Sequence, residues 1–353
     1  MKTICVIGTV GIPACYGGFE SLVQNLVDNA SDEIKYSIFC SANNYTEKLD
    51  SYNGANLIYI PINANGIQSI FYDIWSLIKC IKIRPDVVLI LGVSGCIFLP
   101  IFSMLSRCKI ITNIDGLEWR RNKWSNFAKK FLKFSESLAV KYSDSIITDN
   151  KAIYDYVYKE YGIESTVIAY GGDHAIRNID INNSDQEYAL SICRIEPENN
   201  IEMILKAFST SKVCLKFIGN WDMNEYGKRL KKEFSVYENI EMIDPVYDLN
   251  ILYSLRKNCS MYIHGHSAGG TNPSLVEMMH FAVPIIAYDC EFNRNTTHNY
   301  ALFFSNCDEL QKHFSMRDDN WNKFGNKFGN KLLSVALENY SWKRINEQYE
   351  NLY

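Results

Sequence analysis

The sequence predicts an α/β protein built from two consecutive doubly wound domains of the Rossmann type. Its 353 residues exceed what one hydrophobic core usually organises. Strand-like and helix-like segments alternate, and the alternation restarts after Tyr170-Gly171-Gly172-Asp173 and a polar stretch, Arg177–Gln186. We therefore expect an N-terminal domain over residues 1–172, a C-terminal domain over 173–335 and a closing helix over 336–353 that packs back toward the first domain. Two such sheets would face a cleft between their carboxyl ends, where ligands of open α/β sheets bind.

Short apolar runs rich in β-branched residues predict the strands of the first half, and longer stretches of helical periodicity separate them. The predicted strands are Thr3–Ile7, Tyr36–Cys40, Asn56–Ile60, Val87–Leu91, Lys109–Asn113, Ser145–Thr148 and Thr166–Ile168. The predicted helices are Phe19–Ala30, Ile67–Ile83, Trp124–Tyr142 and Lys151–Tyr161. Right-handed crossovers should connect the parallel strands.

The second half repeats this pattern. Its predicted strands are Tyr188–Cys193, Val213–Ile218, Ile240–Ile243, Cys259–His264, Pro284–Tyr288 and Ala301–Phe304. Its predicted helices are Asn199–Phe208, Glu225–Phe234, Val246–Lys257 and Pro273–Phe281, and a last helical stretch, Leu332–Tyr353, closes the chain.

Composition excludes several classes of protein. A net charge of −4 argues against a dedicated nucleic-acid binder, which would carry a basic excess. Eleven cysteines without a close C-x-x-C pair favour reduced thiols in a cytoplasmic protein over a disulfide framework or a zinc site. The segment Val87–Ser106 is uncharged and long enough to span a membrane, but Gly92, Gly95 and Pro100 favour a buried strand, a loop and a short packed helix. The N-terminus lacks the pattern of a signal peptide.

A glycine-rich loop, Gly8–Gly18, follows the first strand and leads into a helix that opens with Phe19-Glu20. Such a loop lets backbone N–H groups approach an anionic ligand at the helix N-terminus. The spacing matches neither the dinucleotide fingerprint nor the P-loop, so an ordinary strand-to-helix turn remains an alternative.

Two positions in the second half could hold an anion in the same way. Arg194 follows a predicted strand and could clamp a diphosphate with paired N–H donors, although an ion pair with Glu196 or Glu198 is an alternative. Further on, the strand Cys259–His264 is followed by a polar loop with Asn272 and Pro273 as helix-start residues. The amides of Gly270, Thr271 and Ser274 would then surround a positive helix end, with Glu277 one turn into the helix, within reach of ribose hydroxyls.

Two histidines and one acidic residue complete the set of candidate site residues. His264 and His266 in this loop could be structural, but the context favours a functional His266. Asp115, at the end of a first-domain strand, is placed to reach a cleft. The sequence contains no obvious metal-ligand spacing, and we expect neither a metal nor another cofactor.

The segment Trp119–Lys141 is basic and aromatic. It holds seven Lys or Arg residues and one acid, Glu136, which gives a local charge of +6. Aromatic residues such as Trp124 and Phe127 lie between the bases. An amphipathic surface of this kind suits an anionic membrane face, while a solvated helix face is the alternative.

Four blocks of the sequence together resemble the GT-B glycosyltransferases of family four, and most closely their bacterial rhamnosyltransferase branch, which acts on lipid-linked cell-wall or capsule precursors. The blocks are Gly11-Ile-Pro-Ala-Cys-Tyr-Gly-Gly-Phe-Glu20, Asp115-Gly-Leu-Glu-Trp-Arg120 with Lys123-Trp124-Ser125, Arg194-Ile-Glu-Pro-Glu-Asn-Asn200, and His264-Gly-His-Ser-Ala-Gly-Gly-Thr-Asn-Pro-Ser-Leu-Val-Glu277. The resemblance implies a GT-B fold and metal-free sugar transfer with retention of configuration.

The resemblance also implies roles for individual residues. Arg194 would bind the donor diphosphate and Glu277 the ribose, and Gly17 and Gly18 would approach the donor phosphate or the reacting sugar. Asp115 and His266 would lie near the reacting sugar. The expected donor site also includes Asn199, Gly270, Thr271, Asn272 and Ser274, and the expected acceptor site on the first domain includes Tyr16, Glu20, Glu118, Trp119 and Arg120.

Two departures from the family pattern bear on the substrate. Asn199 stands where the wider family has a Lys, and Gly269 where it has the first Glu of an E-x7-E pair. The rhamnosyl branch resembles this chain at both positions, which favours dTDP-rhamnose as the donor. His266 is our candidate to replace the missing Glu.

We therefore expect a cytoplasmic enzyme, peripheral to the inner face of the plasma membrane through residues 119–141, that transfers rhamnose to a lipid-linked saccharide in surface polysaccharide synthesis. A sugar-nucleotide epimerase or hydrolase of the same fold is one alternative. A non-catalytic sugar-nucleotide-binding subunit of a membrane polymerase is another.

Overall fold

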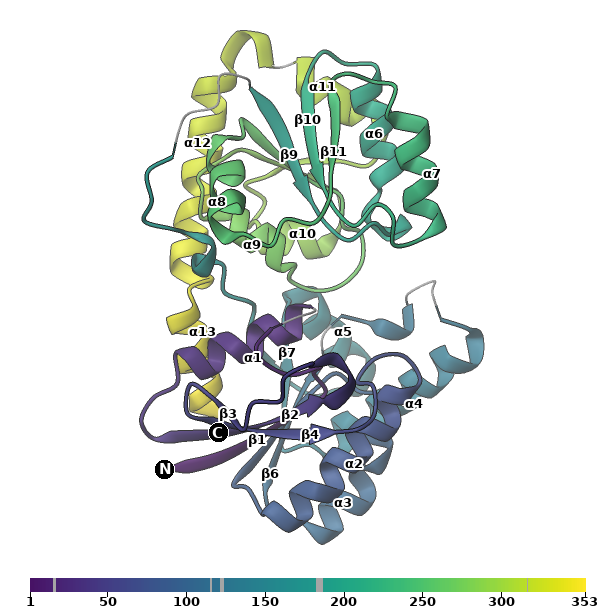
Figure 1. The fold of residues 1–353 in the computed structure, drawn as a ribbon, viewed down its shortest axis with the longest axis vertical. Helices are drawn as coiled ribbons and strands as arrows, with labels where there is room; N and C mark the ends of the chain where they lie inside the picture. Colours follow the sequence, from purple (N-terminus) through teal and green to yellow (C-terminus); the bar gives the residue numbers. More distant parts are fainter. Residues whose placement is uncertain (15–16, 115, 121–123, 182–186, 316) are drawn as a thin grey trace. The chain divides into compact units, whose positions relative to one another are not determined.

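The computed structural model describes residues 1–14, 17–114, 116–120, 124–181, 187–315 and 317–353. The chain divides into two compact units (Figure 1). Unit 1 comprises Met1–Ala169 together with Trp342–Tyr353, and unit 2 comprises Tyr170–Ser341. Each unit is a sheet of mostly parallel strands covered by helices, as the alternating pattern of the sequence predicts.

Unit 1 is built on an eight-stranded sheet of order β3-β4-β2-β1-β5-β6-β7-β8. Its strands are β1 (Lys2–Ile7), β2 (Ile34–Ser41), β3 (Ser51–Tyr52), β4 (Ala55–Ile60), β5 (Val87–Leu91), β6 (Lys109–Ile114), β7 (Ser145–Thr148) and β8 (Thr166–Val167). Neighbouring strands pair in parallel except β3 and β4, which form an antiparallel hairpin at the sheet edge. The central strand β5 is buried along its whole length, as a parallel strand covered on both faces should be.

The helices of unit 1 form two groups of contacts. They are α1 (Gly18–Asp28), α2 (Gln68–Ile83), α3 (Leu99–Leu105), α4 (Asn126–Tyr142), α5 (Lys151–Tyr161) and α13 (Trp342–Leu352). Helix α3 contacts both α2 and α4, whereas α1 contacts α13. The uncharged segment Val87–Ser106 forms β5, a turn of 3-10 helix and α3, so the prediction of a strand, a loop and a short helix is confirmed. In the described part of the chain, no helix has the length and apolarity needed to cross a membrane.

The end of the chain belongs to unit 1. The Nζ atom of Lys2 donates to the backbone oxygen of Tyr353 (2.8 Å), and the amide of Asn113 donates to the hydroxyl of Tyr349 (2.8 Å). The prediction of one closing helix over Leu332–Tyr353 is wrong: α12 (Arg317–Asn339) ends first, and α13 begins at Trp342. The chain changes unit at this break, between Ser341 and Trp342.

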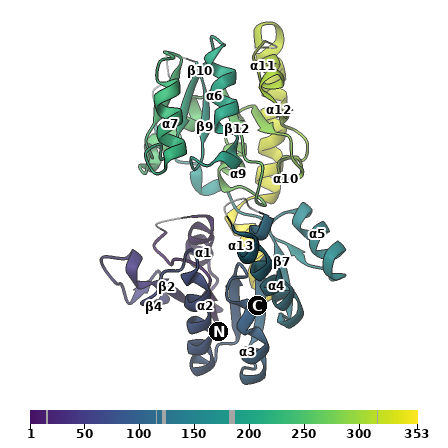
Figure 2. The same ribbon diagram turned by 90° about the vertical axis from the view of Figure 1, so that its right-hand side faces the viewer.

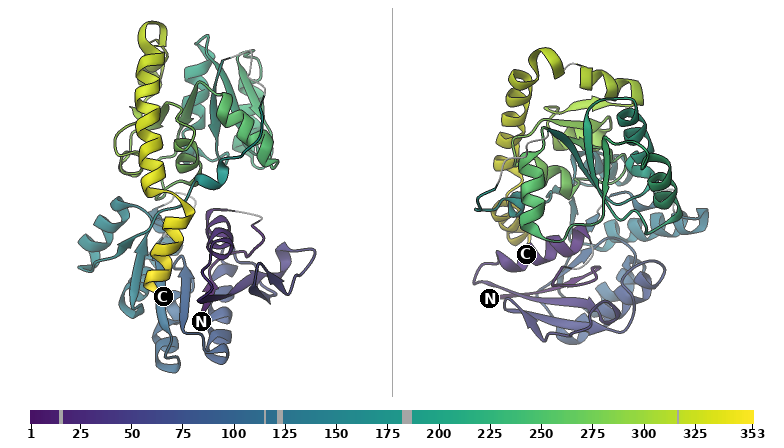
Figure 3. Two further views of the ribbon diagram at one scale, coloured as in Figure 1. Left: turned by 90° about the vertical axis from the view of Figure 1, so that its left-hand side faces the viewer. Right: turned by 45° about the horizontal axis from the view of Figure 1, so that its top comes forward.

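Unit 2 is a six-stranded, fully parallel sheet of order β11-β10-β9-β12-β13-β14. Its strands are β9 (Tyr188–Ile192), β10 (Cys214–Ile218), β11 (Ile240–Ile243), β12 (Met261–His264), β13 (Ile285–Tyr288) and β14 (Leu302–Phe304). Its helices are α6 (Ile201–Ser209), α7 (Glu225–Phe234), α8 (Leu249–Asn258), α9 (Pro273–Met279), α10 (Glu291–Thr296), α11 (Cys307–Ser315) and α12. Figure 3 shows α12, in yellow, as a long helix along this unit, where it contacts α9. The core of unit 2 contains the fully buried rings of Phe208, Phe217 and Trp221.

A buried carboxyl group supports the loop that follows β5. Asp73 of α2 is almost fully buried and accepts a hydrogen bond from the backbone N–H of Gly95. Gly95 must lack a side chain here, because a Cβ atom would lie 2.2 Å from the Cβ of Asp73. Burial raises the pKa of Asp73 to about 8. The folded protein therefore holds a proton at this position that the unfolded chain releases near pH 4.

We expect Asp73→Asn to stabilise unit 1 increasingly as the pH rises. The raised pKa means that folding takes up a proton between about pH 4 and pH 8, so wild-type stability falls over this range by up to about 1.4 kcal/mol per pH unit. Asn keeps an oxygen acceptor for Gly95 and does not ionise. Thermal unfolding at pH 5 and pH 8 should show a gain for the variant that is several kcal/mol larger at pH 8. An equal effect at both pH values would contradict the raised pKa.

Candidate functional site

In unit 2 the two loops that carry the predicted donor residues meet at one edge of the sheet. Strands β9 and β12 are parallel neighbours, so the loops that follow them, residues 193–200 and 265–272, emerge at the same edge. Ser267 joins them, because its N–H and its hydroxyl both donate to the backbone oxygen of Glu198 (3.1 and 2.7 Å). The amide of Asn200 donates to the backbone oxygen of Gly265 (2.8 Å). We call this paired set of loops the β9–β12 edge.

Arg194 lies on the first of these loops with an exposed side chain and a fixed backbone. The amide of the buried Asn199 donates to the backbone oxygen of Arg194 (2.7 Å). Gly265 packs so closely against this loop that a Cβ atom at position 265 would lie 2.2 Å from the backbone oxygen of Asn199. The structure thus gives Asn199 a positioning contact with Arg194 and leaves the guanidinium at the surface of the unit.

The second loop ends at the N-terminus of α9. Asn272 caps this helix, since its Oδ1 accepts from the N–H (3.1 Å) and the hydroxyl (2.8 Å) of Ser274, and Pro273 is the first helical residue. The predicted cap is therefore confirmed. The hydroxyl oxygen of Tyr262 lies 3.2 Å from both the Ser274 hydroxyl and the backbone oxygen of Ile192. Through this contact the helix start is tied to the end of β9. Thr271 is buried in the same turn, and Gly270 is partly exposed.

Two histidines stack where β12 ends and the loop after it begins. The rings of His264 and His266 are 4.4 Å apart and nearly parallel, with an angle of 16°. His264 is fully buried, and neither ring nitrogen has a hydrogen-bond partner among the described residues. Burial, reinforced by the adjacent His266, holds the pKa of His264 well below its usual range. His264 is therefore neutral at physiological pH and cannot add positive charge to the site.

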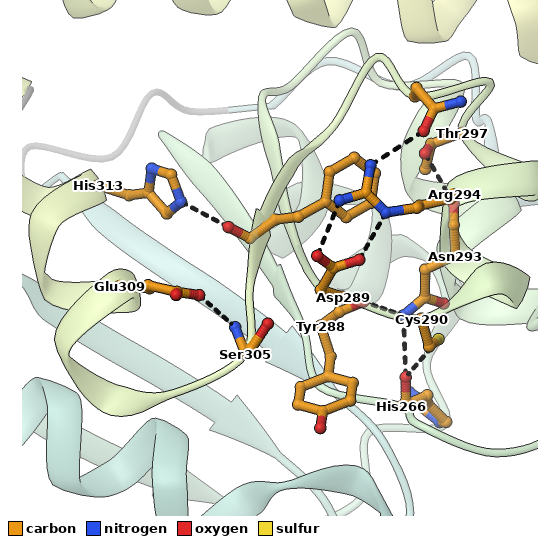
Figure 4. A network of polar contacts seen from close by, with 12 residues as sticks. His266, Tyr288, Asp289, Cys290, Asn293, Arg294, Thr297, Ser305, Glu309 and His313 are labelled. Atoms are coloured by element: carbon orange, nitrogen blue, oxygen red, sulfur yellow. Dashed lines mark hydrogen bonds and ion pairs between the residues drawn. The ribbon is translucent and has the colours of Figure 1, made fainter.

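The backbone around His266 is anchored from helix α10, as Figure 4 shows. The amide of Asn293 donates to the backbone oxygens of His266 (2.9 Å) and Tyr288 (2.8 Å). Close by, Arg294 makes a bidentate ion pair with Asp289 (2.5 and 2.8 Å). These contacts fix the position of His266 relative to the end of β13.

Glu277 lies in a cluster of charged side chains that is largely shielded from solvent. Its Oε2 pairs with Arg256 of α8, and its Oε1 lies 3.3 Å from the Nε2 of His174. Burial alone would raise the pKa of Glu277, but Arg256 and His174 together hold it below its ordinary value. Gly172 packs against α9 so closely that a Cβ atom at position 172 would lie 2.6 Å from the backbone of Val276. The segment that carries His174 is therefore held tightly on this helix. Glu277 is thus an oriented, ionised carboxylate one turn from the helix start.

In unit 1 the glycine-rich loop is closed by Glu20. This side chain is buried and accepts from the N–H of Val10 (2.7 Å), the hydroxyl of Thr9 (2.9 Å) and the N–H of Gly17 (2.8 Å). Gly17 is the N-cap of α1, and Gly18 is its first residue. With both oxygens engaged in this way, Glu20 shapes the loop. Its contribution to an acceptor site would come through the position of Gly17 and Gly18.

Trp119 and Arg120 belong to a cluster around the buried Glu136 of α4. The carboxylate of Glu136 accepts from the indole of Trp119 (3.1 Å) and from the hydroxyls of Tyr156 (2.5 Å) and Tyr161 (2.6 Å). The guanidinium of Arg120 lies 5.1 Å from the ring centres of both Trp119 and Tyr156, at cation–π distance. Glu118 lies nearby and accepts from the indole of Trp124 (3.2 Å).

An open groove of about 840 Å³ adjoins this cluster. Its lining carries four basic side chains, Arg120, Lys129, Lys130 and Lys133, against the single acid Glu160. Lys133 pairs with Glu160 (3.0 Å) and lies over the ring of Trp119 (4.8 Å). The groove is therefore a basic, aromatic surface suited to an anionic group.

Two predicted site residues, Tyr16 and Asp115, lie outside the described residues. Within the described ranges, no group of three or more His, Cys, Asp or Glu side chains is placed to hold a metal ion. The pairing of Glu277 with Arg256 and His174 was not predicted from the sequence, and Glu136 was predicted only as a lone acid. A single acid in an otherwise basic segment was the available signal for the Glu136 cluster.

Comparison with known families gives two matches. Residues 173–314 match the model of the family described as glycosyl transferases group 1. Residues 1–173 match a model described as a domain of unknown function, DUF1972. No curated protein matches the chain.

Solved structures establish the fold. The chain is similar over 100% of its length to 98% of a sucrose-phosphate synthase from Thermosynechococcus elongatus, with a TM-score of 0.85 at 12% identity. It is also similar over 100% of its length to 99% of HepE from Anabaena, solved in complex with UDP-glucose, with a TM-score of 0.76 at 14% identity. The S. aureus protein MnaA, solved with UDP, matches 99% of the chain over 95% of its own length, with a TM-score of 0.64 at 15% identity. The chain has the GT-B fold, and the part of it that matches the glycosyl transferases group 1 model is residues 173–314.

Proposed function

We propose that the protein is a retaining glycosyltransferase that moves L-rhamnose from dTDP-rhamnose to a lipid-linked saccharide in bacterial surface polysaccharide synthesis. One observation carries the proposal: at the β9–β12 edge, a surface guanidinium on a fixed backbone and a capped helix start emerge side by side from neighbouring strands. Guanidinium and backbone N–H donors are the groups that bind phosphate oxygens. The glycosyl transferases group 1 match over the same residues supports this reading.

In this proposal unit 2 holds the donor. Arg194 and the amides around Gly270 and Thr271 neutralise the diphosphate as it departs, and Asn199 and Asn272 act by fixing these groups. The N–H of Ser274 is already bonded to Asn272, so Ser274 contributes to the donor site through its position at the helix start. Because such donors are in place before the reaction, they stabilise the developing charge without reorganisation. Glu277 accepts hydrogen bonds from the ribose hydroxyls, a role for which its ionised state is suited. His266 contacts the transferred sugar.

Unit 1 presents the acceptor. Gly17 and Gly18 allow close approach of a phosphate or a sugar, and the acceptor site is shaped or lined by Tyr16, Glu20, Glu118, Trp119 and Arg120. Asp115 acts at the reacting sugar. The basic, aromatic groove beside Trp119 suits the phosphate of a lipid-linked acceptor, and residues 119–141 make peripheral contact with the inner face of the plasma membrane.

A donor panel tests this function. The purified protein is incubated with a lipid extract and one nucleotide sugar in each reaction. The sugars tested are dTDP-rhamnose, UDP-glucose and other nucleotide sugars, and the lipid-linked products are analysed by mass spectrometry. We expect a lipid product heavier by one deoxyhexose with dTDP-rhamnose only. Release of free sugar or an epimer without a lipid product would identify an epimerase or hydrolase. Intact donor after long incubation would identify a non-catalytic subunit.

A further inference from the structure

Helix α2 exposes apolar side chains on the face that points away from the sheet. Phe71, Trp75 and Ile78 are spaced by four and three residues, so they form one stripe along the helix. Phe71 is 61% exposed, and the other two are exposed as well. A surface helix of a globular domain normally carries polar residues on the face that points away from the core. The opposite face is buried through Tyr72 and Leu77, so α2 is apolar on both faces.

Helix α3 extends this apolar surface. Its side chains Ile101, Met104 and Leu105 are exposed, and Met104 is 84% exposed. Figure 2 shows α3 beside α2 at the end of unit 1, and the two helices are in contact. We refer to the outer sides of these two helices, with the six apolar residues named here, as the α2–α3 face. An exposed apolar surface built by two adjacent helices marks an interaction site.

The charged residues of these two helices and of the segments between and after them are mostly positive. Residues 67–109 contain five bases: Lys79, Lys82, Arg84, Arg107 and Lys109. The only acids in this range are Asp73 and Asp86. Asp73 is buried, and Asp86 accepts hydrogen bonds from the N–H and hydroxyl of Thr3 (both 2.8 Å). Lys82, Arg84 and Arg107 are exposed at the margin of the apolar surface.

We propose that the α2–α3 face docks on an anionic lipid bilayer. Phe71, Ile78, Ile101 and Met104 can enter the boundary of the acyl chains, and the amphipathic ring of Trp75 suits the level of the headgroups. The marginal bases then meet the lipid phosphates, each adding to the attraction at low salt. A second copy of the chain fits less well, because a twofold contact through this face would bring two positive margins together.

This surface is separate from the α4 segment that the proposed function assigns to the membrane. Helix α4 carries its own exposed Phe127 and Phe134 among lysines, and it contacts α3. The α2–α3 face would hold the protein on the bilayer whether or not the groove beside Trp119 binds an acceptor. The two contacts can therefore be tested independently.

A vesicle-binding experiment with the full chain tests the α2–α3 face. Vesicles of phosphatidylcholine, with and without about one third phosphatidylglycerol, are floated with wild-type protein and with the triple variant Trp75→Ser/Ile78→Ser/Met104→Ser. We expect the wild type to float with the anionic vesicles and the variant to bind them about tenfold more weakly. A matched control removes three exposed apolar side chains of unit 2, Met223→Ser/Val236→Ser/Tyr247→Ser, and should bind like the wild type.

Further measurements separate the rival explanations. Thermal unfolding of the triple variant without vesicles should match that of the wild type, so its loss of vesicle binding cannot come from misfolding. The charge variant Lys82→Glu/Arg107→Glu should lose binding to the anionic vesicles. Equal binding by the wild type and the triple variant, or no wild-type binding, would overturn the proposal. It would also be overturned if light scattering showed a wild-type dimer that the triple variant converts to a monomer.

Discussion

Replacing Arg194 by Ala should lower turnover of the nucleotide sugar by about two to three orders of magnitude while leaving the fold intact. The loss follows from the proposed role: as the sugar leaves, charge builds on the diphosphate, and the guanidinium can meet it with two oriented N–H donors. Folding should not change, because the side chain is exposed and the contact that fixes this loop uses only the backbone oxygen of Arg194. Steady-state kinetics and thermal unfolding of the same preparation measure both effects.

Two further variants make the result specific. Arg194→Lys keeps the charge but loses the paired donors, so it should recover only part of the activity. Arg229→Ala removes another exposed arginine of unit 2, which pairs with Glu202 and Glu233 on the surface, and it should behave like the wild type. Wild-type turnover in Arg194→Ala would remove this residue from the site and leave the β9–β12 edge without its main cation.

The fold could be predicted from the sequence because the hydrophobic period and the length of each segment distinguish its strands from its helices. Lys151–Tyr161 and Glu225–Phe234 are helices with the predicted bounds, since each follows a capping asparagine and is flanked by strands. The hairpin partner β3 was missed because two residues give no pattern. Helix α10 was missed because its six residues carry too few turns to show a period. Helix α11 was missed because most of its nine residues are polar, which leaves few apolar positions to show one. The break between α12 and α13 depends on a change of packing partner, which local sequence does not record.

The candidate site divides in the same way. Chain-local features such as the Asn272 cap could be predicted, because the cap and the helix it starts are adjacent in the sequence. The pairing of Glu277 with Arg256 and His174 joins segments up to 103 residues apart, which only the folded chain brings together. For Glu136, the sequence shows a lone acid among bases. The structure shows instead that three aromatic donors bury and satisfy it.

The second large effect should come from Arg256→Met, which we expect to destabilise unit 2 by about 3 kcal/mol or more at neutral pH. This substitution keeps an apolar chain of similar length but leaves the ionised Glu277 in a nearly buried site with only His174 beside it. The carboxylate then bears most of its desolvation cost without its main partner. Thermal unfolding at pH 7.5 measures the loss.

The pH dependence identifies the cause of this loss. In the wild type the pKa of Glu277 is lowered by folding, so the stabilisation is complete above its ordinary pKa and is lost as the pH falls through the lower folded value. In Arg256→Met that contribution is already absent, so the difference from the wild type should shrink toward acid pH. The double variant Arg256→Met/Glu277→Met removes the unpaired charge and should regain much of the stability at pH 7.5, while donor binding stays weak if Glu277 holds the ribose. If the single variant lost the same stability at every pH, packing around Arg256 would be the cause, and the charge pairing of Glu277 would not.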